Sequence, residues 1–145
     1  MKLIIYTDGA SRGNPGHAAY GFVIFDENKK LLYQAGKYIG ITTNNMAEYT
    51  AVLQALKHVK KMESRIKNQE LGDKQFEIQL FADSKLVAEQ LSGRFKVKSS
   101  SLKPIIAKIK ILAQEMGGVT FSHIPRRQNT LADQMANKAL DNKLP

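Results

Sequence analysis

The stretch TTNNMAEYTAVLQALKHV, residues 42–59, marks a change in the hydrophobic pattern of the chain. Within it, apolar residues recur at positions 46, 49, 52, 53, 56 and 59, which is the spacing of one face of an α-helix. Asn44 and Asn45 stand directly before this periodic segment, where the N-cap of a helix is expected. The pattern predicts a helix from about residue 46, and residues 71–73 are expected to end whatever extension it has.

Before this helix, the pattern of apolar and turn-forming residues predicts three strands. Residues 3–7 form a short apolar run that is typical of a buried strand, and residues 18–26 and 31–39 are predicted as the second and third strands. Residues 9–16, between the first two strands, are rich in Gly, Ser, Asn and Pro and are predicted as a loop. Short connections between consecutive strands indicate an antiparallel meander.

The part of the chain after the helix alternates between strands and helices. The predicted elements are a strand over 76–83, helices over 84–92 and 101–116, a strand over 119–124, a loop over 125–129 and a last helix from 130 to about 140. The sequence contains neither a repeat nor a linker. Residues 1–145 are therefore predicted to form a single α/β domain in which helices flank a mixed five-stranded sheet.

The composition narrows the classes of function. Twenty-two Lys and Arg residues against 13 Asp and Glu residues give a net charge of +9, which favours a polyanionic partner such as nucleic acid, although a solvated basic surface remains an alternative. The absence of cysteine excludes disulfides, thiolate metal sites and a cysteine nucleophile. No apolar run is long enough for a membrane span or a signal peptide, so a cytoplasmic protein is expected.

Four acidic residues stand at the predicted ends of secondary-structure elements: Asp8, Glu48, Asp83 and Asp133. In open α/β sheets, functional groups gather at strand ends and at the helix starts beside them. Each acid also has a structural alternative. Asp8 with the glycine that follows fits a turn, Asp83 fits an N-cap, and Glu48 and Asp133 fit capping boxes. Spacing alone leaves both interpretations open.

The local sequence around these acids favours the functional interpretation. It consists of four blocks: YTDGASRGNPG (6–16), TTNNMAE (42–48), ADS (82–84) and NTLAD (129–133). In this order and spacing, the chain resembles type 1 ribonuclease H over essentially its whole length. The order of elements predicted above agrees with the fold of that family. The resemblance implies an endoribonuclease that hydrolyses the RNA strand of RNA–DNA hybrids and leaves 5′-phosphate and 3′-hydroxyl ends.

The resemblance also implies a metal centre, because Asp8, Glu48, Asp83 and Asp133 match the four catalytic carboxylates of the family. Carboxylates packed together repel one another unless cations neutralise them, and hard oxygen ligands suit Mg²⁺ or Mn²⁺. Two such ions about 3.5–4 Å apart activate a water molecule and stabilise the leaving oxygen. We therefore expect two Mg²⁺ or Mn²⁺ ions when substrate is bound.

Short polar side chains are expected to read the hybrid. Asn14, Asn44 and Asn45 match family positions that contact the two strands across the minor groove, where the RNA 2′-hydroxyl is exposed. Thr43 matches a residue that helps to hold a phosphate of the DNA strand. Caps and turns are the alternative role for all four side chains. The family often carries an arginine two positions before that threonine, and Ile41 stands there in this chain, which predicts a weaker grip on this phosphate.

A basic segment over 93–110 is the next candidate for phosphate binding. It holds six basic residues and no acidic one, and Lys96 and Lys98 are its proposed substrate contacts. Its connection is too short for the basic protrusion of many relatives, and the chain carries no hybrid-binding domain, so we expect a short form of the family. A second basic run over 57–67 is predicted to be a solvated helix face.

The loop before the last helix is expected to contribute to catalysis through Arg126. Some relatives carry a flexible histidine in this loop, whereas others carry an arginine after the proline, as here after Pro125. His123 falls inside a predicted strand and is interpreted as structural.

Two rival functions remain. One is a catalytically silent hybrid-binding module, which the presence of all four acids argues against. The other is a DNA nuclease or resolvase of the same superfamily, which the asparagine-rich blocks argue against. A monomer without an obligatory protein partner is expected.

Overall fold

A long β-hairpin begins the fold. The computed structural model describes residues 1–68, 76–96 and 98–143. Strands β1 (Lys2–Gly13) and β2 (Gly16–Asp26) pair antiparallel from Leu3–Asp26 to Gly13–Gly16. The predicted loop over 9–16 was therefore wrong: residues 9–13 continue β1, and the turn is confined to the hairpin tip, where Gly13 has a φ of +102°. Cross-strand pairing outweighs the low strand propensity of Gly, Ser and Asn in this segment.

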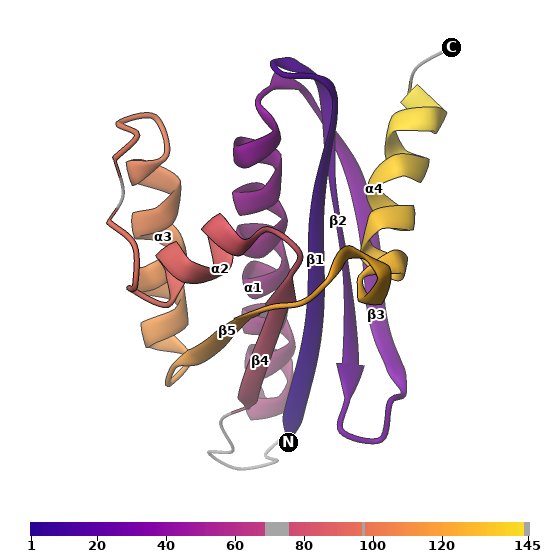
Figure 1. The fold of residues 1–145 in the computed structure, drawn as a ribbon. Helices are drawn as coiled ribbons and strands as arrows, with labels where there is room; N and C mark the ends of the chain where they lie inside the picture. Colours follow the sequence, from indigo (N-terminus) through magenta and orange to yellow (C-terminus); the bar gives the residue numbers. More distant parts are fainter. Residues whose placement is uncertain (69–75, 97, 144–145) are drawn as a thin grey trace.

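The remaining elements follow the predicted order. They are β3 (Leu31–Thr42), α1 (Asn44–Asn68), β4 (Glu77–Ala82), α2 (Lys85–Leu91), α3 (Lys103–Glu115), β5 (Val119–His123), a one-turn 3-10 helix (Arg126–Gln128) and α4 (Thr130–Lys143). The five strands form one sheet in the order β3-β2-β1-β4-β5 (Figure 1). Strands β1, β2 and β3 pair antiparallel, whereas β4 and β5 run parallel to β1, which confirms the mixed sheet. The expected end of the first helix at 71–73 lies outside the described residues.

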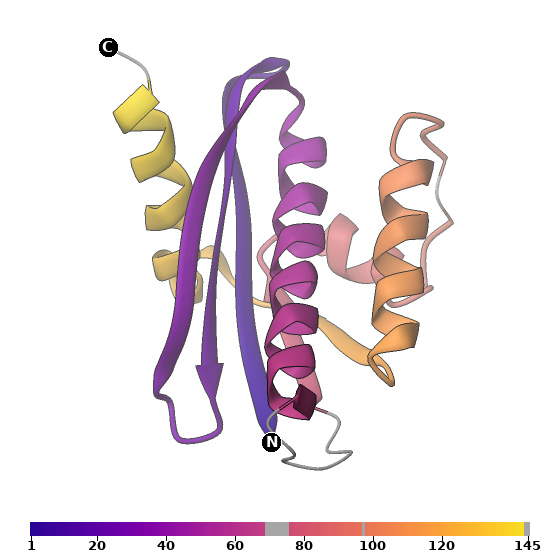
Figure 2. The same ribbon diagram turned by 180° about the vertical axis from the view of Figure 1, so that it is seen from behind.

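Helices cover both faces of the sheet. Helix α1 packs along β1 and β2 on one face with α3 beside it, and α4 crosses β2 and β3 on the other face (Figures 1 and 2). The predicted periodic face of α1 is buried, with Tyr49, Val52, Leu56 and Val59 all at 0% exposure. Burial of each such side chain contributes about 1.5–3 kcal/mol relative to exposure. None of the described helices has the length and apolar character needed to cross a bilayer.

Helix α1 begins at Asn44, earlier than the predicted start near residue 46. The hydroxyl of Thr43 accepts a hydrogen bond from the backbone N–H of Met46 at 3.1 Å, so Thr43 is the N-cap, and Asn44 and Asn45 are the first two helical residues. The expectation of an N-cap at Asn44 or Asn45 was wrong, because the threonine one position earlier takes that role. Glu48 is consequently not the acid of a capping box. Its side chain is buried instead.

Candidate active site

The site forms where β4 stops beside β1. The parallel pairing of these strands ends with Thr7 opposite Ala82, so Asp8 and Asp83 come directly after the last paired residues. Strand β1 continues past Asp8, which corrects the expectation that Asp8 ends the first strand. Asp83 precedes α2, but Ser84 is the N-cap of that helix, because its hydroxyl accepts from the N–H of Val87 at 3.3 Å. The carboxylate of Asp83 therefore does not cap the helix.

Glycine brings α1 onto the sheet beside Asp8. A Cβ built on Gly9 would lie 2.3 Å from the backbone nitrogen of Glu48 and 2.4 Å from the carbonyl carbon of Ala47. Only a residue without a side chain permits this approach. The backbone N–H of Gly9 also favours the ionised form of the Glu48 carboxyl group and so acts to lower its pKa.

A second glycine admits α4 from the opposite face. Gly21 pairs with Asp8 across the hairpin, and a Cβ on Gly21 would lie 2.4 Å from the carbonyl oxygen of Ala132. Asp133 is the next residue of α4, so the close packing of α4 on Gly21 brings Asp133 toward Asp8. Asp133 lies in the first turn of α4, and its Oδ1 accepts from Nδ2 of Asn137 at 3.1 Å.

The structure brings all four predicted acids together. Carboxylate oxygens of Asp8, Glu48 and Asp83 all lie within 4.8 Å of one another. Asp133 stands outside this group of three, but it lies near enough to Asp8 to contribute to the raised pKa of that carboxyl group. Asp8 and Glu48 are each only 4% exposed, whereas Asp83 and Asp133 are partly exposed. The cluster therefore has a buried inner pair and a more accessible outer pair.

Burial and like charges make this cluster unfavourable when it is fully ionised. Burial, followed by the charges of Glu48 and Asp83, raises the pKa of Asp8 from 3.8 to about 10. Burial also raises the pKa of Glu48 from 4.5 to about 7, although hydrogen bonds from Asp8 and from the Gly9 N–H and the charge of Arg126 act in the opposite direction. In the metal-free chain at neutral pH, the inner pair therefore retains at least one proton.

The donor set fits a hard divalent cation. Oε2 of Glu48 is buried and has no hydrogen-bond partner among the described residues. A buried carboxylate oxygen without a donor is costly, and a cation bound among three carboxylates compensates both this oxygen and the mutual repulsion. Asp8, Glu48 and Asp83 are the residues that would hold such an ion, with Asp133 beside them.

The predicted minor-groove residues gather at one end of the molecule. Oδ1 of Asn14, at the tip of the hairpin, accepts from the backbone N–H of Asn44 at 3.0 Å. Thr43 and Asn44 are exposed and Asn45 is partly exposed. These four side chains therefore lie together at the N-terminal end of α1. Because the helix begins at Asn44, Glu48 follows just after its first turn and not within it, which corrects the expectation that Glu48 belongs to the first turn. Ile41 is 69% exposed on β3 in the same region.

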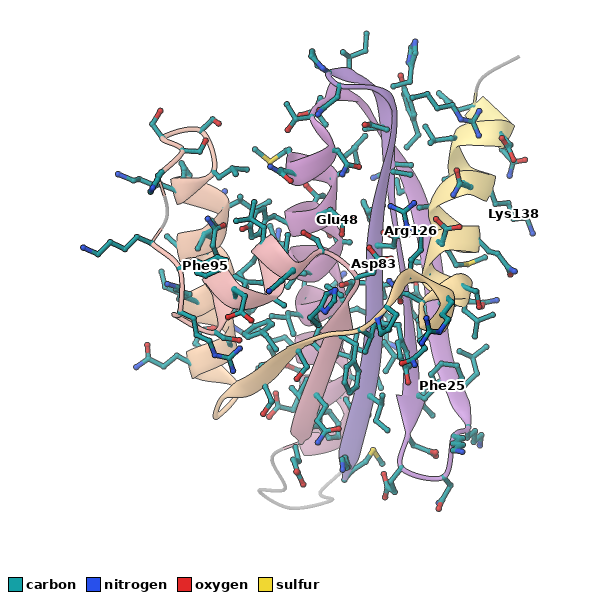
Figure 3. The ribbon with its side chains drawn as sticks, in the orientation of Figure 1. Phe25, Glu48, Asp83, Phe95, Arg126 and Lys138 are labelled. Carbon is teal, nitrogen blue, oxygen red and sulfur yellow. The ribbon has the colours of Figure 1, made fainter. Side chains whose placement is uncertain are left out.

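Arg126 joins the site, whereas the two lysines lie apart from it. Arg126 is exposed in the 3-10 turn, and its positive charge acts to lower the pKa of Glu48. Figure 3 shows Arg126, Glu48 and Asp83 gathered at the centre of the molecule, with Phe95 to their left on the connection between α2 and α3. Lys96 and Lys98 are exposed on that same connection. The structure thus brings Arg126, but not the lysines, to the acids.

Two further residues lie near the site. His123 is the last residue of β5, as its predicted place in a strand requires, where it pairs with Ala82, and its side chain is exposed. The sequence predicts no separate role for Asn129 within the block 129–133. In the structure, its Nδ2 donates a hydrogen bond to Oδ2 of Asp83 at 3.1 Å. In a sequence, an asparagine directly before a helix is typical of an N-cap. That local interpretation gives no indication of the contact between Asn129 and Asp83.

Comparison with known proteins identifies close relatives. Residues 6–139 match a family described as reverse transcriptase-like. A bifunctional protein of Mycobacterium tuberculosis is 37% identical over 97% of this chain, and the chain spans only 36% of that relative's length. Ribonuclease H of Polynucleobacter asymbioticus is 33% identical, with 99% of this chain and 92% of that protein covered. The crystal structure of LC11 ribonuclease H1 in complex with an RNA/DNA hybrid has a TM-score of 0.87 and 40% identity, with 99% of both chains covered.

Proposed function

Because the chain belongs to the type 1 ribonuclease H family, we propose that it hydrolyses the RNA strand of RNA–DNA hybrids with the help of two Mg²⁺ or Mn²⁺ ions. The observation that carries this proposal is the approach of the Asp8, Glu48 and Asp83 carboxylates to within 4.8 Å of one another. A buried cluster of this kind is unfavourable without cations and is suited to binding them. The solved complex of a relative with an RNA/DNA hybrid supports the choice of substrate.

The proposed reaction is an in-line displacement at a phosphodiester of the RNA strand. Water oxygen forms a bond to phosphorus, the bond from phosphorus to the ribose 3′ oxygen breaks, and that oxygen takes up a proton. The water proton passes to solvent, so the products carry a 5′-phosphate and a 3′-hydroxyl. When bound, the divalent ions supply a more acidic water and charge stabilisation at the leaving oxygen. Asp8, Glu48, Asp83 and Asp133 hold them.

The remaining residues of the site bind and orient the hybrid. Asn14, Asn44 and Asn45 face the minor groove and sense the 2′-hydroxyl, and Thr43 contacts a DNA-strand phosphate. All four lie at the end of α1 that carries Glu48. A guanidinium group offers hydrogen-bond donors and no acceptor, so Arg126 acts by its charge and its donors and not as a base.

Lys96 and Lys98 extend the binding surface away from the acids. Both are exposed on a connection that Arg94 ties back to α2, with its guanidinium 3.1 Å from a carboxylate oxygen of Glu89. We propose that this connection follows the phosphates of the hybrid beyond the cleavage site. One chain supplies all four carboxylates, so the acidic cluster needs no second copy to be complete. We propose that the enzyme acts as a monomer and that it acts in the cytoplasm.

A substrate panel tests the proposal. End-labelled RNA–DNA hybrid, duplex RNA and duplex DNA are incubated with chain purified from a host that lacks its own ribonucleases H, with Mg²⁺, Mn²⁺ or EDTA. We expect cleavage of the RNA strand of the hybrid alone, and only with metal. Tight binding without cleavage would instead favour a silent binding module, and cleavage of duplex DNA would favour a DNA nuclease.

A further inference from the structure

Asn129 connects three segments that carry acids. Its side chain is 1% exposed, and its Nδ2 donates both to the carbonyl oxygen of Thr7 at 2.8 Å and to Oδ2 of Asp83 at 3.1 Å. Its own carbonyl oxygen accepts from the N–H of Asp133 at 3.2 Å. Thr7 directly precedes Asp8. Asn129 therefore hydrogen-bonds to the segments that carry Asp8, Asp83 and Asp133.

The orientation of this amide is unlike that of a capping asparagine. An N-cap side chain accepts hydrogen bonds through its oxygen from the first N–H groups of a helix. Here the amide uses its donor end, and Oδ1 is buried with no hydrogen-bond partner among the described residues. An unsatisfied buried acceptor is costly, and an apolar side chain of similar volume would avoid that cost. The two hydrogen bonds that Nδ2 donates are therefore the reason that an asparagine is needed at this position.

We propose that Asn129 is a positioning residue that fixes the Asp83 carboxylate for metal binding, an inference that rests on the metal-dependent activity proposed above. By holding Oδ2, the amide sets the direction of the whole carboxylate, while the bond to Thr7 ties the amide to the strand that carries Asp8. Donors that orient a ligand in this way affect metal affinity although they never touch the metal.

Two variants test this role. Asn129→Leu keeps most of the volume and removes both donors. Asn129→Asp keeps the shape, replaces the donor with an acceptor and provides the test if the leucine variant does not fold. We expect the Kd for Mn²⁺, measured by titration calorimetry and by electron paramagnetic resonance without nucleic acid, to rise about 10–100-fold in both variants. Hybrid affinity in EDTA should not change.

Gln90→Leu is the matched control, because Gln90 is also a buried amide but bonds to Tyr49 and to none of the acids. It should lose thermal stability and keep the wild-type affinity for Mn²⁺. In the Asp83→Asn background, Asn129→Leu should cause no further loss of Mn²⁺ affinity, because the group that it orients is already changed.

The outcomes separate this inference from the proposed function. A folded Asn129→Leu or Asn129→Asp protein with wild-type Mn²⁺ affinity would overturn the positioning role, even if the wild-type chain cleaves hybrids. A wild-type chain that binds Mn²⁺ but cuts no hybrid would overturn the proposed function. Reduced Mn²⁺ affinity in the Asn129 variants would still support the positioning role in that case.

Discussion

Gly9 lies directly against the backbone of Glu48: a Cβ on this glycine would be 2.3 Å from the Glu48 nitrogen. The backbone N–H of the same glycine acts to lower the pKa of Glu48. Gly9 thus sets how closely the start of α1 approaches β1. The spacing between Asp8 and Glu48 depends on this contact, since Gly9 follows Asp8 in the chain.

Gly9→Ala should damage the site more than the fold. The added methyl group meets backbone atoms, which cannot rotate away, so the first turn of α1 must shift. We expect a stability loss of about 1–3 kcal/mol by chemical denaturation and a loss of hybrid cleavage of more than about 10-fold. Gly118→Ala is the control: Gly118 lies between α3 and β5, outside the proposed binding connection, with a φ of +107° and open space around its Cβ position, so this change should cost stability but leave cleavage intact. Equal cleavage by both variants would contradict the contact argument.

The metal-free chain should become less stable as the pH rises. Because burial raises the pKa of Asp8 to about 10, the folded state holds a proton that the unfolded chain releases above pH 4. Folding therefore takes up a proton at neutral pH, and each unit of pH costs up to about 1.4 kcal/mol. Burial and nearby cations lower the pKa of His58, which acts in the opposite direction only below about pH 6.5. Melting temperatures in EDTA should fall between pH 7 and pH 9, and Mn²⁺ should reverse the fall. An unchanged melting temperature across this range would show that the cluster is not strained.

Neutralising Lys96 and Lys98 should weaken the salt dependence of hybrid binding. If both lysines contact phosphates, replacing them with Gln should lower the slope of log K against log salt by up to about 2. Lys29 and Lys30 are exposed in the turn between β2 and β3, and their replacement with Gln changes the net charge equally. The control pair should leave the slope unchanged. Equal slopes in both double variants would show that Lys96 and Lys98 only face solvent.

Arg126→Ala should lower kcat by about 10–100-fold, with a smaller change in KM. This range corresponds to the loss of one charge-assisted contact at roughly 1.4–2.8 kcal/mol. Arg127 is exposed beside it in the same turn, so Arg127→Ala is a matched control that should mainly weaken binding in a salt-dependent manner. Steady-state kinetics on one hybrid distinguish them. A kcat loss confined to Arg127→Ala would reassign the role within the loop, and no loss in either variant would remove the loop from catalysis.

The sequence predicted the element order and the four acids, for identifiable physical reasons. Helical spacing of apolar residues reports which face of α1 is buried, and Tyr49 and Leu56 are indeed fully buried. Asp8 and Asp83 stand at the ends of apolar runs, before Gly9 and Ser84, whereas Glu48 and Asp133 stand near the predicted starts of helices. The motif blocks around Asp83 and Asp133 are informative only together with the other two blocks. The structure places the carboxylates of Asp8, Glu48 and Asp83 in one group, with Asp133 beside Asp8.

The errors concern features that depend on contacts between distant segments. Residues 9–13 form a strand only because β2 pairs with them. The role of Asn129 depends on Thr7 and Asp83, which lie far away in the chain. Thr43 and its two asparagine neighbours are all good N-caps, so composition did not decide which of them caps α1.

Asp8→Asn tests the central claim most directly. The amide keeps the shape of the carboxyl group, removes one metal ligand and replaces a group that must take up a proton when the metal-free chain folds. The purified variant is assayed for hybrid cleavage at saturating Mn²⁺ and for melting temperature in EDTA. The account predicts no cleavage together with an unchanged or slightly raised melting temperature. Cleavage at a rate close to that of the wild-type chain would contradict it.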